Sequence, residues 1–435
     1  MFIVNEINSF TISFWGTVTK EKGFGGEDML ATLIPMFDKN MIVRGYSIFA
    51  QRDNLLLDPI KSGSGYLDSA MRIEGMDIIN SMGLDSLVDN REVFLPVGNV
   101  SLFTDIKGQG ANPPGRIVIL IDHSVKPEEQ YVERIKELRR QGFKFAIKGI
   151  PLNELGDYKP IIDAMDYMFL NHHRVNITNA KKLFNTIYPN VELCAVSVGT
   201  QEEYDVLKET GGFELYEGEF FRLPRHSKDT ELAPLKVTYL ELLKLVNDED
   251  FDLTKAADII GRDPALVLSL LKIVNNMTVN SGITSVRNAA AMMGQKELKR
   301  WINTAVTKEL CSDRPSEVTR MSLIRARFAE NLAAVFDEQG LSQELFLMGL
   351  FSVLDIILEK PMAECLESIN ISKQIRDALV DGKGTMARIF NFMKEYENAS
   401  WQEVSRLALL GNIDLDAVYD AYLSSLSWYR DLISL

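Results

Sequence analysis

The first half of the chain alternates short apolar runs with amphipathic segments. Residues 117–121 are five consecutive aliphatic residues, which predict a strand buried on both faces. Residues 127–141 follow with apolar side chains at helical spacing, acidic residues at their start and basic residues at their end, so they predict a helix. The same unit recurs, with strands predicted at 143–147, 164–170, 191–198 and 213–221 and helices at 177–187 and 201–210.

Strand–helix units repeated without long gaps predict a parallel α/β sheet. A closed, TIM-like (β/α) barrel is favoured over an open doubly wound sheet, because no Gly-x-Gly-x-x-Gly turn follows an early strand.

After residue 221 only helical periods remain. Residues 222–234 are polar and carry Pro224 and Pro234, which is typical of a linker between domains. Helices are predicted at 235–246, 253–260, 264–275, 286–293, 296–310, 318–339 and 343–359. The pattern therefore predicts an N-terminal extension (1–31), a barrel (32–222), a linker (223–234) and an all-α helical bundle (235–435).

The charge of the chain disfavours nucleic-acid binding. The net charge is −14, with 24 basic against 31 acidic residues before Ser227 and 23 against 30 from there on, so no basic domain is present. Residues 253–275 have helix-turn-helix spacing, but the second helix is apolar nearly all round. That pattern predicts a buried helix rather than one that contacts bases.

The cysteines and the N-terminus indicate a cytoplasmic protein without a membrane partner. Cys194, Cys311 and Cys365 are far apart and form no Cys-x-x-Cys pair, so they are expected to be small buried side chains in a reducing compartment. The N-terminus lacks the early basic residues of a signal peptide, and no run of about 18 uncharged apolar residues occurs.

Several stretches resemble known families. Pro35-Met-Phe-Asp-Lys-Asn with Gly45-Tyr46, the strand–helix–strand of 117–150, and Glu217-Gly-Glu-Phe-Phe-Arg-Leu-Pro224 resemble the EAL domain of bacterial cyclic-di-GMP phosphodiesterases. The second half resembles the HDOD domain, a helical relative of HD phosphohydrolases, in Leu270-Leu-Lys-Ile-Val-Asn-Asn276, Gly282-Ile-Thr-Ser-Val-Arg-Asn-Ala289, Met293-Gly-Gln, Lys299-Arg-Trp301 and residues 349–355. The resemblance covers about residues 33–422 and implies a bacterial signal-transduction protein with both domains.

The resemblance also implies that the EAL chemistry has been lost. Phosphodiester hydrolysis in that family needs divalent metal ions held by carboxylates and one amide, and a base that activates water. Pro96 offers no ligand atom, and Lys148 brings a cation to a place where a metal ion would bind. The family's site positions fall on Ser47, Pro96, Leu120, Lys148, Gly149, Phe169, Asn171 and Val196. We therefore expect no catalytic residues, no metal and no cofactor in the barrel.

The helical half is expected to lack a metal site as well. HD phosphohydrolases use a His-Asp pair and further histidines, and the resemblance implies that Ser352-Val353 stand in the place of that pair. The last 209 residues contain no histidine. HDOD domains in general lack this site.

Two further groups of residues have alternative interpretations. His172-His173 follow a predicted strand at the end where barrel sites lie, but adjacent strand residues point in opposite directions, so a surface loop is favoured over a remnant ligand-binding role. Lys296, Lys299 and Arg300 with Trp301 form either a solvated face or a docking site for an acidic partner.

The leading hypothesis is a catalytically inactive signalling protein that acts through protein–protein contacts. The alternative is a sensor that binds cyclic-di-GMP, or another nucleotide, without hydrolysing it. Pairing through the barrel is common among EAL relatives, which implies a homodimer.

Overall fold

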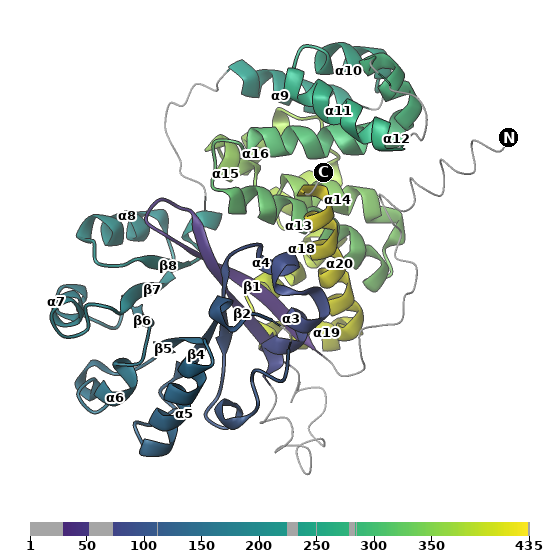
Figure 1. The fold of residues 1–435 in the computed structure, drawn as a ribbon. Helices are drawn as coiled ribbons and strands as arrows, with labels where there is room; N and C mark the ends of the chain where they lie inside the picture. The colour runs from purple at the N-terminus through teal and green to yellow at the C-terminus, as the bar shows by residue number, and fades with distance from the viewer. Residues whose placement is uncertain are drawn as a thin grey trace.

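The computed structural model describes residues 29–51, 73–110, 112–223, 234–248, 250–277, 283 and 285–433. Most of the expected N-terminal extension and of the expected linker lies outside these residues; Leu30 and Ala31 already belong to the first strand. Figure 1 shows a barrel followed by a larger set of helices that pack against one side of it. The predicted fold class, an α/β barrel followed by a helical domain, is confirmed.

The first half forms a closed barrel in which the strands neighbour one another in chain order. β2 to β8 are parallel, as predicted, but β1 is antiparallel to both of its neighbours, β2 and β8. The strands are β1 (Leu30–Phe37), β2 (Val43–Gln51), β3 (Glu92–Pro96), β4 (Ile117–Asp122), β5 (Lys144–Lys148), β6 (Tyr167–Asn171), β7 (Glu192–Val198) and β8 (Leu215–Gly218).

The reversed first strand follows from a short connection. Only residues 38–42 join β1 to β2, which is too short for a helical crossover between parallel strands. Asp38 Oδ1 accepts hydrogen bonds from the backbone N–H groups of Asn40 (2.7 Å) and Ile42 (3.0 Å), and Met41 has a φ of 61°. The turn is therefore a side-chain-stabilised hairpin.

The three helices predicted around the barrel are present as α5, α7 and α8, whereas α3, α4 and α6 were not predicted. Asn176 and Thr200 cap the first turns of α7 and α8 with their side chains, so these helices begin where the sequence predicts. The helices are α3 (Glu74–Met82), α4 (Leu84–Val88), α5 (Glu129–Arg140), α6 (Lys159–Ile162), α7 (Ile177–Ile187) and α8 (Gln201–Thr210).

The last predicted strand of the barrel is shorter than expected. β8 ends at Gly218, and a 3-10 helix occupies Phe220–Arg222. Gly218 has a φ of 153°, and a Cβ there would lie 2.1 Å from the backbone oxygen of Val198. The close approach of β7 and this backbone conformation end the regular strand.

The second half is helical throughout its described residues. The predicted helix 343–359 is broken at Ser352 and Val353, and the predicted pair 286–293 and 296–310 forms one helix kinked at Gly294. The helices are α9 (Pro234–Val246), α10 (Leu253–Ile260), α11 (Pro264–Met277), α12 (Val286–Leu310), α13 (Ser316–Val335), α14 (Ser342–Phe351), α15 (Leu354–Leu358), α16 (Met362–Glu367), α17 (Lys373–Val380), α18 (Gly384–Glu397), α19 (Trp401–Gly411) and α20 (Leu415–Ile433).

Most apolar stretches in this half pack into its core, but some apolar side chains stay exposed. Residues Gln339–Leu358 are the one described helical stretch that is long and apolar enough to cross a membrane, but 61% of its apolar window is buried inside the fold, as core helices also are. α11, predicted to be buried nearly all round, leaves Leu268 71% exposed, because α12 covers only part of its surface. The three cysteines are buried and unpaired, as predicted.

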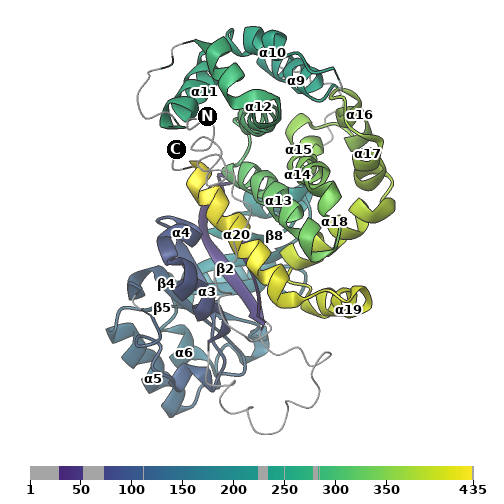
Figure 2. The same cartoon turned by 90° about the vertical axis from the view of Figure 1, so that its right-hand side faces the viewer.

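The helical domain covers the edge of β1 that β8 leaves open. β8 pairs with β1 only at Met36 and Phe37. Further back along β1, the Tyr396 hydroxyl of α18 donates to the Ala31 carbonyl (3.0 Å) and accepts from its N–H (3.4 Å). Tyr422 of α20 lies 3.3 Å from the Thr32 hydroxyl. Figure 2 shows α20 beside the first two strands, so tyrosines satisfy a strand edge that would otherwise be unpaired.

A buried charged cluster joins the same two parts. The Tyr46 hydroxyl on β2 donates to Glu317 Oε2 at 2.8 Å, and Arg320 donates to Glu317 Oε1 at 2.9 Å. The guanidinium of Arg320 also lies over the Tyr46 ring, 4.8 Å from its centroid. We name Tyr46, Glu317 and Arg320 the joint cluster. All three side chains are buried, so the two domains share part of one core.

Candidate functional site

The interior of the barrel is packed with apolar side chains. On each strand alternate residues point inward, as the alternation of a barrel requires. Leu120 and Phe169, two of the positions at which the resemblance implies lost ligands, belong to this packing and are 2% and 5% exposed. The interior cluster consists of Met36, Phe94, Val118, Leu120, Ala146, Tyr167, Phe169, Cys194 and Leu215, with Val196 packed against it.

The predicted positions lie in the carboxyl-end half of the barrel interior and at its rim, a region that we name the mouth. Strand register pairs Pro96 with Leu120, Lys148 with Phe169, and Asn171 with Val196. Each of these residues is an even number of positions along its strand from a residue of the interior cluster, or is paired with one, so all of them face inward. Ser47, which pairs with Phe94, faces inward as well. Gly149 follows the last residue of β5 with a φ of 74°. The predicted positions thus share one site.

Lys148 is the cation of this mouth, and two carboxylates face it. Register pairs Lys148 with Asp122, and its ammonium lies 5.9 Å from the centroid of the Phe49 ring. Partial burial opposes ionisation of Asp122, but hydrogen bonds from Ser124 and the Lys148 charge hold the pKa of Asp122 below its ordinary value. Burial raises the pKa of Glu217, and Lys148 offsets part of that effect.

Asp122 and Glu217 were missed as members of the site by sequence reasoning. The step of two from Leu120 to Asp122 was the available signal, because it places Asp122 on the inward face of β4. Ser47, in contrast, is a polar residue of the mouth without a charge. It is 1% exposed, and its hydroxyl has no hydrogen-bond partner among the described residues. The mouth therefore mixes one cation, two carboxylates and apolar or unpartnered groups.

In the helical half, Ser352 and Val353 stand where the resemblance implies a His-Asp pair, and they lie next to a buried ion pair. Ser352 Oγ donates to the Gly349 carbonyl (2.7 Å) and accepts from Arg325 (3.2 Å). Arg325 in turn donates to both oxygens of Glu397 at 2.8 to 3.0 Å. A Cβ on Gly349 would lie 2.3 Å from the Arg325 carbonyl, so α13 and α14 approach closely here. Val353 is fully buried.

The basic group for which a solvated face or a docking site was expected is largely internal. Trp301 is 3% exposed, because α12 packs its ring into the helical core. Arg300 donates to both oxygens of Glu330 at 2.6 Å and lies 4.2 Å from the centroid of the Phe346 ring. Lys299 is half-buried, which lowers its pKa, and only Lys296 is fully exposed. The predicted anchors are therefore structural, which corrects the docking interpretation.

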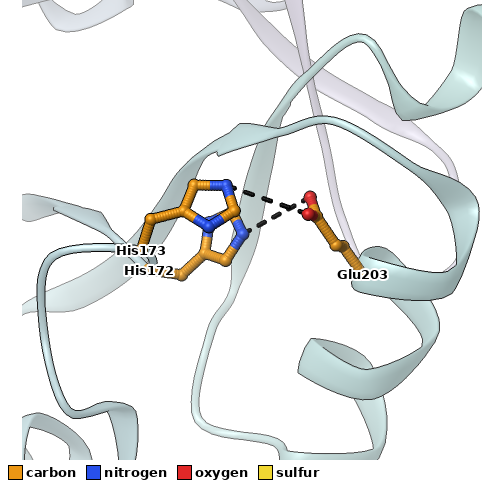
Figure 3. A group of neighbouring side chains, drawn as sticks. All are labelled: His172, His173 and Glu203. Atoms are coloured by element: carbon orange, nitrogen blue, oxygen red, sulfur yellow. Dashed lines mark ion pairs between the residues drawn. The ribbon is translucent and has the colours of Figure 1, made fainter.

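His172 and His173 do not point apart as predicted. They follow β6 in a turn rather than in the strand, and their ring centroids lie 3.8 Å apart with the planes tilted by 40°. Both rings face Glu203 of α8 (Figure 3): His172 Nε2 is 3.5 Å from Glu203 Oε2, and His173 Nε2 is 3.8 Å from Glu203 Oε1. In the described part of the chain this is the group of residues that could hold a metal ion.

Glu203 was also missed by the sequence analysis, although its position carries a local signal. Thr200-x-x-Glu203 is a capping-box pattern, and Thr200 Oγ1 accepts from the Glu203 N–H at 3.2 Å. The Gly199 N–H donates to Glu203 Oε2 at 2.7 Å and, with the nearby histidines, holds the pKa of Glu203 below its ordinary value against a small desolvation effect. The cap fixes the carboxylate beside the end of β6.

Comparisons with known proteins give two curated relatives and several solved structures. The chain is 25% identical over 325 residues to the cyclic di-GMP phosphodiesterase CdgJ of Vibrio cholerae, covering 74% of each chain. It is 24% identical over 410 residues to the protein YuxH of Bacillus subtilis, covering 92% of this chain and 97% of that one. A solved standalone EAL protein from Vibrio cholerae O395 with bound c-di-GMP is 17% identical, with a TM-score of 0.34 over 45% of this chain and 92% of that chain.

The match to a family model lies in the helical half. Residues 232–377 match the family model of the HDOD domain. This match begins two residues before α9 and extends into α17. The chain therefore carries an HDOD domain, preceded by a closed eight-stranded barrel.

Proposed function

We propose that this chain is a bacterial cytoplasmic signalling protein with a degenerate EAL barrel, which does not hydrolyse cyclic-di-GMP and acts through protein–protein contacts. The similarity to a cyclic-di-GMP phosphodiesterase supports a place in signalling by that nucleotide. The resemblance also favours a homodimer. The shared core of the barrel and the HDOD half supports one rigid unit that presents a composite surface to its partner.

One observation supports the proposed inactivity: a lysine ammonium and apolar side chains occupy positions at which the resemblance to EAL domains implies metal ligands. A two-metal phosphodiesterase clamps its substrate with cations held by several oxygen ligands. At the mouth, Lys148 contributes a fixed positive charge between Asp122 and Glu217, while Leu120 and Phe169 fill the adjacent inward positions. Two carboxylates beside an ammonium form an ion pair more readily than a site for two divalent ions.

The test is a hydrolysis assay of the full chain with cyclic-di-GMP and Mg²⁺ or Mn²⁺. We expect no metal-dependent turnover above a protein-free blank. An Asp122→Asn variant serves as the matched control, since it removes the ionised carboxylate of the mouth. Turnover by the wild type that disappears in Asp122→Asn would overturn the proposal.

A nucleotide sensor is the second candidate, and Lys148 is the observation that favours it. A partly enclosed ammonium complements a phosphate diester without cutting it. Calorimetry with cyclic-di-GMP up to about 100 μM separates the two candidates, because a sensor of ordinary affinity saturates below that concentration. Binding by the wild type that is lost in Lys148→Met would support the sensor, and no heat would exclude it.

A further inference from the structure

We propose that His172, His173 and Glu203 form a binding site for a divalent transition-metal ion, and that this ion is Zn²⁺. We name these residues the rim triad. The site lies at the carboxyl ends of β6 and β7, in residues that follow the inward-facing Asn171 and Val196, and it uses none of the positions at which EAL enzymes hold their metals. The inference is independent of whether the barrel hydrolyses a nucleotide.

The first argument is the orientation of His172. Its Nδ1 lies 3.0 Å from the Val196 carbonyl, an acceptor, so Nδ1 carries the ring proton. In the neutral ring Nε2 then carries a lone pair, and this atom faces the Glu203 carboxylate. The side chain is 8% exposed, and Nε2 is buried with no hydrogen-bond partner among the described residues. An N–H to a backbone carbonyl is also how metal-binding histidines are commonly fixed.

The second argument is that three acceptor atoms converge. The two Nε2 atoms and a carboxylate oxygen of Glu203 lie within 4.8 Å of one another. Ligand atoms at such distances can be bridged by one shared cation. Protons on both rings would place two positive charges on stacked imidazoles whose centroids are 3.8 Å apart, and these would repel each other. One metal ion satisfies all three acceptors without that repulsion.

The ligand set and its spacing indicate the class of metal. Imidazole nitrogens with one carboxylate suit Zn²⁺ and similar ions, whereas Mg²⁺ and Ca²⁺ prefer oxygen ligands alone. Tetrahedral Zn²⁺ places its ligand atoms about 3.3 Å apart. Here His172 Nε2 is 3.5 Å from Oε2 and His173 Nε2 is 3.8 Å from Oε1 of Glu203, and one ligand atom from each of the three residues lies within 4.8 Å of the others, so small side-chain shifts bring them to that spacing. His173 is 55% exposed and Glu203 34% exposed, so an ion can enter from solvent. Three protein ligands leave a coordination position for water or another donor.

The capping role of Glu203 explains its position but not the histidines. The cap uses Oε2, which accepts from Gly199, while Oε1 faces His173 and has no part in that hydrogen bond. Helix capping by Glu203 also does not require a buried imidazole next to the carboxylate. Capping alone therefore does not account for the arrangement of the rim triad.

Zinc titration of the metal-stripped full chain tests the site. We expect one Zn²⁺ per chain by calorimetry, and a visible tetrahedral absorption band when Co²⁺ replaces it. His173→Ala and Glu203→Gln should each weaken Zn²⁺ binding by at least about tenfold. Glu203→Gln keeps an amide oxygen for the Gly199 hydrogen bond, so it tests the ligand rather than the cap.

His123→Ala and Glu202→Gln are the matched controls, because both side chains are exposed and lie outside the rim triad. They should bind Zn²⁺ as the wild type does. The buried cysteines do not compete for the ion in the folded chain. Absence of Zn²⁺ binding by the wild type, or wild-type affinity in His173→Ala or Glu203→Gln with circular dichroism unchanged, would overturn the proposal. No nucleotide is present in this experiment, so its outcome is separate from that of the hydrolysis assay.

Discussion

The mouth of the barrel and the joint between barrel and helices differ in how well their buried polar groups are hydrogen-bonded. In the mouth, Ser47 has a buried hydroxyl without a partner among the described residues, and Glu217 is held in a place that disfavours its charge. In the joint, Tyr46, Glu317 and Arg320 are buried and hydrogen-bonded to one another. Well-satisfied buried polar groups hold one specific arrangement, whereas poorly satisfied ones add little to stability.

This difference indicates where the molecule depends on polar contacts. Removing a partner from a satisfied buried network leaves an uncompensated charge, but trimming an unpartnered group removes almost nothing. The helical half and its joint should therefore be sensitive to conservative changes that the mouth tolerates. The following substitutions test the contrast from the largest effect to the smallest.

Arg325→Ala should have the largest effect. Its partner Glu397 is buried, and the two side chains are 7% and 10% exposed, so the change leaves a buried carboxylate unpaired. We expect a loss of about 3–5 kcal/mol in the free energy of unfolding, measured with urea. Arg406→Ala is the control, because its pair with Glu403 is solvent-exposed and should contribute little to stability. Equal effects of the two changes would contradict the prediction.

Tyr46→Phe should weaken the joint by a smaller amount. It removes only the hydroxyl that donates to Glu317, while Arg320 still pairs with that carboxylate. A hydrogen bond to a charged group contributes about 1.5–3 kcal/mol, and we expect a loss in that range by urea unfolding. Tyr131→Phe, on a half-exposed ring outside the joint, should change stability little; a matching loss there would refute the role of the Tyr46 hydroxyl.

The joint should also make the fold sensitive to alkaline pH. Burial and then Glu317 raise the pKa of Tyr46, and burial raises the pKa of Tyr396. The folded chain keeps these protons, while the unfolded chain loses them near pH 10, so stability is complete below pH 10 and falls above it by about 1.4 kcal/mol per pH unit for each tyrosine. Urea unfolding from pH 9 to 11 measures the slope, which Tyr46→Phe should reduce; an unchanged slope would exclude Tyr46 as a source.

Two serines give the smallest and most closely matched comparison. Ser322 is fully buried and donates to the Leu350 carbonyl at 2.7 Å, so Ser322→Ala should cost about 1 kcal/mol. Ser47→Ala removes a buried hydroxyl without a described partner and should be neutral or slightly stabilising. Thermal unfolding of both variants measures the difference, and a larger loss for Ser47→Ala would mean that the mouth uses this hydroxyl.

Local sequence signals predicted much of the fold. Helices 177–187 and 201–210 have the predicted bounds, because Asn176 and Thr200 cap them and their apolar faces pack on the barrel. The antiparallel β1 was not predicted, since it depends on the short Asp38 turn rather than on the strand pattern. The break at Ser352 was missed because continuous apolar residues hide it; close packing at Gly349 and the Arg325 contact set it.

The site was predictable where the strand register governs it. Ser47, Pro96, Lys148 and Asn171 share the mouth because alternation places them all inside. The rim triad was not foreseen: strand alternation was assumed through His173, but β6 ends at Asn171 and the turn brings both rings to one side. A contact between a turn and the next helix is non-local, so neither segment alone reveals it.

The tyrosine-covered edge of β1 has a consequence for the order in which the chain is made. β1 is the first described strand to leave the ribosome, whereas Tyr396 and Tyr422 belong to some of the last helices. Until these helices emerge, the nascent barrel therefore carries a strand with an open edge, which can pair with other chains. The edge closes only after α18 and α20 have been made, and chains that stop before these helices should be held by chaperones or degraded.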